Sequence, residues 1–286
     1  MKNLKDKVAA ITGAASGIGR ALALNLADEG CHLAISDINE AGLKETAEMA
    51  RSRNKSARIT THKVNTANRD QVKQYAADVV KAHGAVHIII NNAGVLLLES
   101  LEDVNYDDFE WIIGINMWGV IYGSKEFLPY LRREDEAHIV NISSVNGIFT
   151  NPNNGPYCTA KYAVRGFTET LAQELSGTGI KVSCVHPGGI KTSIADNARF
   201  YKCSDASLRS REDAAAFFNR TIANTTADKA TKIIIAGIKK NKLRIMVGPD
   251  AYLMDWMKRL LPVGFQKFAG RKAAPKWMKK KAGIKS

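Results

Sequence analysis

The chain has 286 residues, of which 45% are hydrophobic, and a formal net charge of +13 at pH 7. This length allows a full hydrophobic core but is short for two ordinary domains, so we expect one large domain. No stretch reaches the roughly 20 apolar residues of a membrane-spanning helix, which excludes an integral membrane protein. The four scattered cysteines form no Cys-x-x-Cys pair and no secretory leader is recognisable, so we expect free thiols in the cytoplasm.

Short apolar runs alternate with helical patterns up to about residue 250. The first expected strand is 8–11, and a Gly-rich turn leads from it into a helix that continues to residue 27. A second helix is expected at 40–53. Further strands are expected at 31–36, 58–64, 86–90, 138–142, 181–186 and 244–247. This alternation predicts an α/β fold with a doubly wound parallel sheet.

Two features of the later sequence suggest an interface between subunits and a lid over the substrate site. The long helical patterns at 106–132 and 157–176 carry apolar residues on more than one face. Such excess apolar surface is typical of a subunit interface, so we expect an oligomer. Residues 193–226 break the alternation with small, polar and aromatic residues, and we interpret them as a lid over a substrate site.

The Gly-rich turn at 12–19 has the sequence Thr-Gly-Ala-Ala-Ser-Gly-Ile-Gly and lies between an expected strand and an expected helix. Glycines allow the backbone to turn tightly and to approach a pyrophosphate, whose charge then lies at the helix N-terminus. Glycine also marks ordinary turns, so the argument depends on the position between strand and helix. In that position the turn predicts a dinucleotide site.

An acidic residue, Asp37, ends the second expected strand. A carboxylate there can accept hydrogen bonds from the adenosine ribose and repels the extra phosphate of NADP. Ser16 stands where a basic residue could pair with that phosphate. Asp37 could instead only cap the following turn. We favour the ribose interpretation and therefore expect NAD in preference to NADP.

Tyr157 and Lys161 are four residues apart in an expected helix, and Ser143 and Ser144 follow an expected strand upstream. Residues four apart lie on one helix face, so the Lys161 ammonium can lie near the Tyr157 phenol. A phenol is a poor base at neutral pH, and a nearby cation favours its ionised form. A Tyr/Lys pair alone is also typical of an ordinary surface helix, so the pair needs support from other motifs.

Together, these motifs resemble the short-chain dehydrogenase/reductase family, in its single-domain branch. The resemblance rests on the turn at 12–19, Asn91 to Gly94, Asn116 before Gly119, Ser144, Tyr157 with Lys161, and Pro187-Gly188 with Thr192, all in family order. It implies a Rossmann fold over residues 1–250 and a homodimer or homotetramer.

The resemblance also implies a role for each matching residue. Tyr157 would be the general acid or base, and Ser144, chosen over Ser143 for its spacing to Tyr157, would orient the substrate oxygen. Lys161 would lower the pKa of Tyr157 and bind the nicotinamide ribose, while Asn116 would support a water in a proton relay. The cofactor-binding set would be Gly13, Ser16, Gly17, Ile18, Gly19, Asp37, Asn65, Asn92, Ala93, Gly94, Tyr157, Lys161, Pro187, Gly188, Ile190 and Thr192. Asn65 departs from the family, which commonly has Asp there, and this puts cofactor affinity in doubt.

The expected reaction is hydride transfer between NAD(H) and a hydrophobic or bulky secondary alcohol or ketone. The apolar side chains expected to line the pocket are Leu96, Leu97, Leu98, Val145, Ile148, Phe149, Phe200 and Tyr201. One alternative is a 3-oxoacyl thioester reductase, which Asp37 disfavours because such enzymes usually resemble NADP-using members. Another is a non-catalytic dinucleotide-binding protein. We expect no metal site, because Gly84 and a strand onset separate His83 from His87.

The last segment, 251–286, carries ten Lys or Arg residues and one acidic residue, Asp255. Read as a helix, it places Tyr252, Trp256 and Leu260 at a spacing of four, a one-sided apolar row. This basic amphipathic extension could pack on the body or close the substrate pocket. Alternatively, its cations could bind anionic lipid head groups while the apolar row inserts at the membrane surface. Nucleic acid would leave the apolar row unused, so we expect no nucleic-acid partner.

Overall fold

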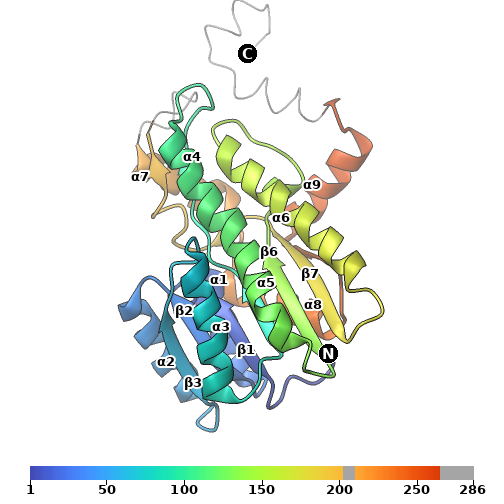
Figure 1. Ribbon diagram of the computed structural model, residues 1–286. Coiled ribbons are helices and arrows are strands. Elements are labelled where there is room, and N and C mark those ends of the chain that lie inside the picture. The colour runs from blue at the N-terminus through green and yellow to red at the C-terminus, as the bar shows by residue number, and fades with distance from the viewer. Residues whose placement is uncertain (202–209, 265–286) are drawn as a thin grey trace, which may run out of the picture.

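The computed structural model describes residues 1–201 and 210–264 and contains a seven-stranded sheet with the order β11-β7-β6-β4-β1-β2-β3 (Figure 1). All neighbouring strands in this sheet are parallel. Its strands are β1 (Val8–Thr12), β2 (His32–Asp37), β3 (Ile59–Lys63), β4 (Ile88–Asn91), β6 (Ala137–Ile142), β7 (Ile180–Pro187) and β11 (Arg244–Val247). The predicted doubly wound α/β fold is confirmed.

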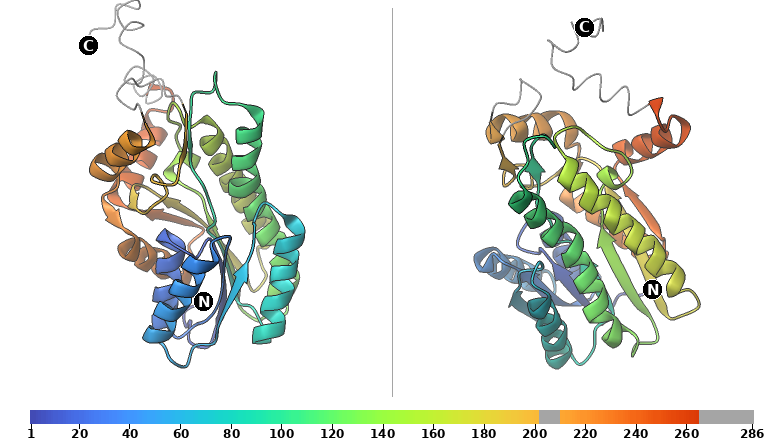
Figure 2. Two further views of the ribbon diagram at one scale, coloured as in Figure 1. Left: turned by 90° about the vertical axis from the view of Figure 1, so that its left-hand side faces the viewer. Right: turned by 45° about the horizontal axis from the view of Figure 1, so that its top comes forward.

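Helices cover both faces of the sheet, as the two further views show (Figure 2). One face packs against α1 (Gly17–Asp28), α2 (Glu40–Arg53) and α8 (Ala227–Lys239). The opposite face packs against α3 (Arg69–His83), α5 (Gly119–Leu131) and α6 (Gly155–Glu174). Because both faces are covered, the inner strands are apolar almost throughout rather than alternating. In β1, for example, every residue is buried.

The strand order reverses between β1 and β4, which are neighbours in the sheet although β2 and β3 separate them in sequence. In open α/β sheets the ligand crevice lies beyond the carboxyl ends of the strands at such a reversal. The Gly-rich turn follows β1, and Asn92 follows β4. The topology therefore brings two of the predicted motifs to the edge at which open α/β sheets bind their ligands.

The helical pattern expected at 106–132 is interrupted in the structure. It consists of α4 (Tyr106–Ile113), a π-helical turn at Gly114–Trp118, and α5. A π turn accommodates an extra residue within a helix and is frequent at functional sites. Here the turn contains the predicted Asn116, which is fully buried.

Residues 193–201 and 210–226, the described part of the expected lid, form short elements at the carboxyl ends of the strands. Two parallel two-stranded pairs, β5 (Leu97–Leu98) with β9 (Arg199–Phe200) and β8 (Ile190–Lys191) with β10 (Thr225–Thr226), connect this segment to the body. Helix α7 (Arg211–Phe217) and a π turn at Phe218–Ile222 follow. Residues 202–209 lie outside the described residues, and Cys203 with them. Cys31, Cys158 and Cys184 are buried free thiols.

The expected basic extension begins within a helix, α9 (Pro249–Leu260). Ala251 is buried against Ile148 and Met246, so the first turn of this helix belongs to the body. Residues 265–286 lie outside the described residues, including the predicted cation cluster at 276–285. In the described part of the chain, no helix is long and apolar enough to cross a membrane.

Candidate active site

Hydrogen bonds from Asn92 and Ala93 hold the Gly-rich turn against the end of β4. The Thr12 hydroxyl oxygen accepts from the backbone N–H groups of Asn92, at 3.0 Å, and Ala93, at 3.1 Å. The Asn92 side-chain amide donates to the carbonyl oxygens of Thr12 and Gly13. Gly13 has φ +66°, and a Cβ there would lie 2.7 Å from Ala93 Cα. Only glycine permits this close approach of the two loops.

The N-terminus of α1 is available to bind an anion. Ser16 occupies the N-cap position with an extended backbone, and its side chain makes no capping hydrogen bond. The first turn holds no acidic residue, so its N–H groups and the helix dipole favour a negative ligand. Thr192 reaches this point from the distant loop after β8: a Cβ built on Gly17 would lie 3.3 Å from Thr192 Cβ. The fold thus brings the predicted residues 16–19 and Thr192 together.

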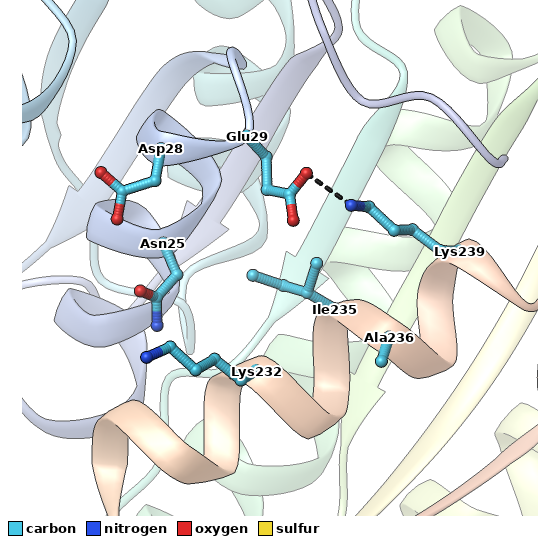
Figure 3. A pocket seen from close by; sticks show the side chains of 7 residues that line it. All are labelled: Asn25, Asp28, Glu29, Lys232, Ile235, Ala236 and Lys239. Atoms are coloured by element: carbon cyan, nitrogen blue, oxygen red, sulfur yellow. Dashed lines mark hydrogen bonds and ion pairs between the residues drawn. The ribbon is translucent and has the colours of Figure 1, made fainter.

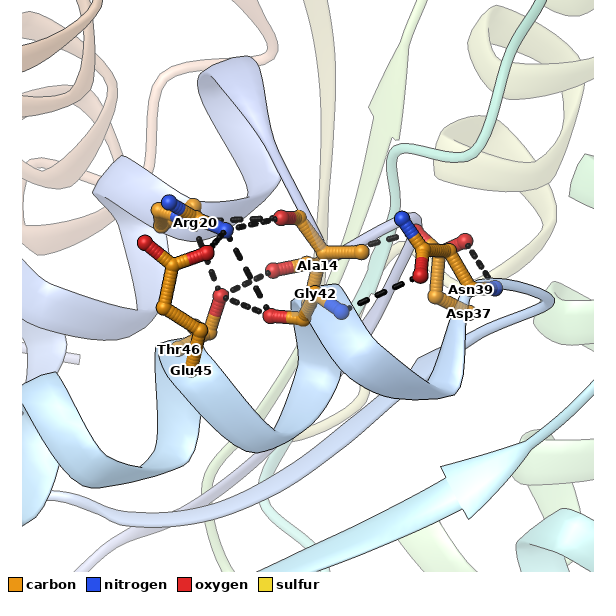
Figure 4. A network of polar contacts seen from close by, with 8 residues as sticks. Ala14, Arg20, Asp37, Asn39, Gly42, Glu45 and Thr46 are labelled. Atoms are coloured by element: carbon orange, nitrogen blue, oxygen red, sulfur yellow. Dashed lines mark hydrogen bonds and ion pairs between the residues drawn. The ribbon is translucent and has the colours of Figure 1, made fainter.

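Asp37 lies at the end of β2, beside the Gly-rich turn (Figure 4). One carboxylate oxygen accepts from the backbone N–H of Ala15 and the other from that of Asn39, both at 3.0 Å. Arg20 lies on the other side of this network. Its guanidinium donates to the carbonyl oxygen of Ala15 and to the Glu45 carboxylate, each at 2.6 Å. The Arg20 guanidinium is therefore already bound by protein groups within this network.

Asn65 is exposed and follows the end of β3, the strand that pairs with β2. Its side-chain oxygen accepts from the backbone N–H of Ala67 at 3.1 Å. The adjoining Val64 donates its backbone N–H to the carbonyl oxygen of Asp37. Asn65 and Asp37 therefore lie on neighbouring strand ends, on the side where an adenosine would be held.

Tyr157 and Lys161 lie one turn apart on α6, with the Lys161 Nζ 5.6 Å from the centre of the Tyr157 ring. Lys161 is 3% exposed, and its Nζ donates to the carbonyl oxygen of Ile142 at 3.0 Å. Burial lowers the pKa of Lys161 to about 8. An ammonium has three donors, so Lys161 retains the capacity to bind further acceptors.

Ser144 follows β6 and begins a 3₁₀ turn, in which its hydroxyl accepts from the backbone N–H of Asn146 at 3.0 Å. Burial raises the pKa of Tyr157 to about 12, and a side-chain hydrogen bond with Ser144 partly offsets that rise. The neighbouring Ser143 instead donates to the Lys161 backbone carbonyl at 2.9 Å, which ties α6 to β6. The structure therefore places Ser144, and not Ser143, at the phenol.

The pKa of Tyr157 is raised rather than lowered, contrary to the expectation for a phenol beside Lys161. Burial disfavours the charged form of both groups, so it raises the pKa of Tyr157 and lowers the pKa of Lys161. At neutral pH Tyr157 is therefore a protonated phenol, suited to donate a proton.

Asn116 connects the π turn to the loop after β4. Its side-chain oxygen accepts from the backbone N–H of Val95 and its amide donates to the Val95 carbonyl, both at 2.8 Å. A Cβ on Gly94 would lie 3.3 Å from the Asn116 side-chain oxygen and 3.6 Å from Lys161 Nζ. Gly94, Asn116 and Lys161, which are far apart in sequence, thus meet at one point.

Two polar residues at the site were not predicted from the sequence. Asp250, at the start of α9, accepts from the backbone N–H of Gly189 at 2.6 Å, and a Cβ on Gly188 would lie 2.1 Å from its carboxylate. His186 is fully buried, and its Nδ1 lies 3.0 Å from the Ser144 carbonyl oxygen. Burial lowers the pKa of His186 to about 4, so it is neutral and donates from Nδ1. The only sequence signal was position, since Asp250 follows a Gly-Pro helix start and His186 precedes Pro187.

A separate hollow of about 260 Å³ lies between α1 and α8 (Figure 3). Its lining residues are Asn25, Asp28, Glu29, Lys232, Ile235, Ala236 and Lys239. The Lys239–Glu29 ion pair, at 2.5 Å, bridges the two helices there. None of the predicted site residues lines this hollow, so it is not the active site.

Comparisons with known proteins agree with the geometry. A family model described as short chain dehydrogenase matches residues 7–200. SadH of Mycobacterium tuberculosis, a protein named as an oxidoreductase, is 40% identical over 269 residues, covering 93% of this chain and 95% of SadH. The 3-oxoacyl-[acyl-carrier-protein] reductase FabG of Thermotoga maritima is 35% identical over 193 residues, covering 68% of this chain and 78% of FabG.

Among solved structures, a short chain dehydrogenase/reductase from Burkholderia phymatum in complex with NAD aligns with a TM-score of 0.82 and 30% identity. The alignment covers 92% of this chain and 96% of that one. The family model spans both the Gly-rich turn and the Ser144, Tyr157 and Lys161 group, and the match to SadH extends over nearly the whole chain. The chain therefore belongs to the short-chain dehydrogenase/reductase family.

Proposed function

We propose that this protein is an NAD(H)-dependent oxidoreductase that interconverts a hydrophobic or bulky secondary alcohol and its ketone. The observation that carries the proposal is the meeting of Ser144, Tyr157 and Lys161 beside an anion-binding helix N-terminus. A proton donor, a second hydroxyl and a buried cation next to a dinucleotide-type turn are the parts that carbonyl reduction needs.

The residues present fit a nicotinamide dinucleotide. Gly13 and Gly17 have positive φ, which the tight turn requires, and the α1 N-terminus is open to a pyrophosphate. Asp37 is positioned at a strand end to accept from a ribose, and Glu45 neutralises Arg20. These features favour NAD over NADP, and the solved relative from Burkholderia phymatum was crystallised with NAD.

When bound, a nicotinamide would supply or accept the hydride, and residues of the protein transfer the proton. During reduction the Tyr157 phenol donates its proton to the carbonyl oxygen, because burial keeps the phenol protonated at neutral pH. Ser144 donates a second hydrogen bond to the same oxygen. Lys161, whose Nζ lies 5.6 Å from the centre of the Tyr157 ring, is the cation that would stabilise the phenolate left behind, and its remaining donors would bind the ribose hydroxyls.

Reprotonation of Tyr157 requires a path to solvent. The Asn116 side chain binds Val95 with one lone pair of its oxygen and one hydrogen of its amide, so one donor and one lone pair remain. These remaining groups would bind a relay water next to Lys161.

The expected pocket residues divide into core and accessible groups. Leu97, Ile148 and Phe149 are buried in the core. Leu96, Leu98, Val145 and Phe200 are partly accessible, and Tyr201 is exposed. The accessible group lies at the carboxyl ends of the strands, where residues 193–201 and 210–226 would close over a substrate. An apolar lining favours an uncharged, hydrophobic alcohol or ketone.

The test is to mix the purified protein with NAD and a panel of hydrophobic secondary alcohols and to follow NADH absorbance. Turnover with at least one alcohol, lost in a Tyr157→Phe variant that still binds NAD, supports the proposal. If no alcohol or ketone reacts while NADH binds tightly, the protein is a non-catalytic dinucleotide-binding protein.

A second candidate is reduction of a 3-oxoacyl thioester, which the identity to FabG favours. The same assay with a 3-oxoacyl thioester and NADPH separates the two candidates. Faster turnover with that pair than with any ketone and NADH would establish the second function.

We also propose a cytoplasmic homodimer or homotetramer assembled through α4, α5 and α6. Trp118, which is 45% exposed, stacks on Tyr122 at 5.5 Å on this helical surface. Light scattering at micromolar concentration tests the assembly, and a purely monomeric protein would rule it out.

A further inference from the structure

Helix α9 presents an apolar face that the described residues leave uncovered. Its inner side is anchored by the buried Ala251 and by the ion pair of Asp255 with Arg244, at 2.6 Å. Its outer apolar residues, and those just after it, are more than half exposed: Tyr252 (52%), Leu253 (57%), Trp256 (62%), Leu260 (70%), Leu261 (56%) and Val263 (58%). The predicted row Tyr252, Trp256 and Leu260 therefore exists, and each of its side chains is more than half exposed.

Cations lie beside this face. A groove of about 160 Å³ between α8 and α9 is lined by Lys240, Lys242 and Arg244 together with the apolar Met246 and Tyr252. Lys240 and Lys242 are exposed. Within α9 itself, Lys258 and Arg259 follow Trp256, and residues 265–286 add eight Lys or Arg residues and no acidic residue.

We propose that α9 and the adjoining groove form a surface that binds an anionic lipid bilayer. Anionic head groups would neutralise the cations, and the interfacial region would accept the aromatic and aliphatic side chains of the outer face. A second copy of this chain would cover the apolar row but would bring two strongly basic segments together. The charge pattern therefore selects the lipid surface over self-association.

The position of α9 links this surface to the active site. α9 lies at the end of the molecule where the strands have their carboxyl ends (Figure 1). Its first residues contact the site, because Asp250 binds Gly189 and Ala251 packs on Ile148 in the loop after Ser144. A protein held by α9 would thus have its substrate entrance near the bilayer. An entrance near the bilayer is useful only if the substrate is hydrophobic, so this link to activity rests on the proposed function. Lipid binding by α9 does not depend on the proposed function.

The experiment is co-sedimentation of the full-length protein with vesicles of phosphatidylcholine alone or mixed with phosphatidylglycerol. We expect binding to the mixed vesicles only, weakened by salt. Trp256→Ser combined with Leu260→Ser should reduce it about tenfold or more, and so should Lys240→Glu combined with Lys242→Glu. Truncation after Gly264 should also weaken binding while keeping α9. Truncation before α9 is unsuitable, because it removes Asp250 and Ala251 from the body.

Matched control variants test whether vesicle binding depends on α9 and the groove or only on the overall charge and apolar surface of the protein. Lys44→Glu with Lys73→Glu makes the same charge change on α2 and α3, and Met49→Ser removes an exposed apolar side chain from α2. Both should sediment like the wild type. The proposal would be overturned if the control variants lost as much vesicle binding as the variants of α9 and the groove. It would also be overturned if the wild type did not bind the mixed vesicles at low salt.

A further outcome concerns self-association. If the Trp256 and Leu260 changes dissociate the oligomer and leave vesicle binding intact, α9 is a subunit interface and the proposal is wrong. Turnover of a water-soluble alcohol, measured without vesicles, reports separately on the proposed function.

Discussion

Replacing Lys161 with methionine should stabilise the cofactor-free protein at pH 7 while abolishing turnover. The ammonium is buried, and its pKa of about 8 in the folded chain compares with an ordinary value of 10.5. Below pH 8 the charge therefore costs the fold about 3 kcal/mol. The variant leaves the Ile142 carbonyl without this donor, a loss of about 1 to 2 kcal/mol. The net gain in unfolding free energy should be about 1 to 2 kcal/mol.

The pH dependence follows from the direction of the shift. Because the folded pKa is lowered, the unfolded chain binds the Lys161 proton more tightly between pH 8 and 10.5. The free-energy cost of burying the Lys161 ammonium therefore disappears as the pH rises through this window, and the wild type becomes more stable. The variant has no ammonium at this position, so its stability shows no such rise. Other groups, such as Tyr157, titrate in both proteins, so the difference between the two proteins isolates Lys161.

Urea unfolding of wild type and Lys161→Met across this pH range measures the difference directly. The exposed Lys73→Met is the control, and it should show no pH-dependent difference from wild type. Saturating NAD should stabilise the wild type more than the Lys161 variant, because the ribose contact is gone. If Lys161→Met is less stable than wild type at pH 7, or if the difference stays constant from pH 8 to 10.5, the burial argument is wrong.

Three further changes test the site. Tyr157→Phe should reduce turnover about a hundredfold or more and leave NADH binding, measured by fluorescence, nearly unchanged; substantial residual activity would contradict the proton-transfer role. Asp37→Ala should narrow the preference for NAD over NADP about tenfold in kcat/KM, and an unchanged ratio would show that this carboxylate does not face the ribose. Asp250→Asn weakens a charge-assisted hydrogen bond to Gly189, so NAD affinity should fall roughly tenfold with kcat much less affected; equal losses in both, with a lower melting temperature, would indicate a merely structural role.

Local patterns in the sequence were sufficient for the elements and for the main catalytic group. The helix expected at 40–53 is α2 (Glu40–Arg53), and the run expected at 8–11 is β1, one residue longer. Hydrophobic periodicity and helix-capping residues are patterns among a few neighbouring residues, so they can be recognised without knowledge of the tertiary structure. Tyr157 and Lys161 could be paired for the same reason, since one helical turn sets their separation.

The sequence could not reveal contacts between segments that the chain brings together only on folding. Asp250 meets Gly189 across 61 positions, and His186 meets the Ser144 carbonyl across 42. The π turn around Asn116 was missed as well, because Val95, which binds its side chain, lies on another loop. No local pattern specifies such partners.

The sequence by itself determined the alternating elements, the order of the motifs and the excess of positive charge in the last segment. Tertiary structure alone decided how much water reaches each charged group. Tyr157 and Lys161 have the predicted separation, yet the pKa of Tyr157 rises because the surrounding core desolvates it. The apolar row of α9 is a second example. Its spacing is compatible with packing on the body or with exposure, and only the structure shows that Trp256 is exposed. The burial of a side chain depends on all the residues that surround it in space. The spacing of residues along the chain does not specify those neighbours.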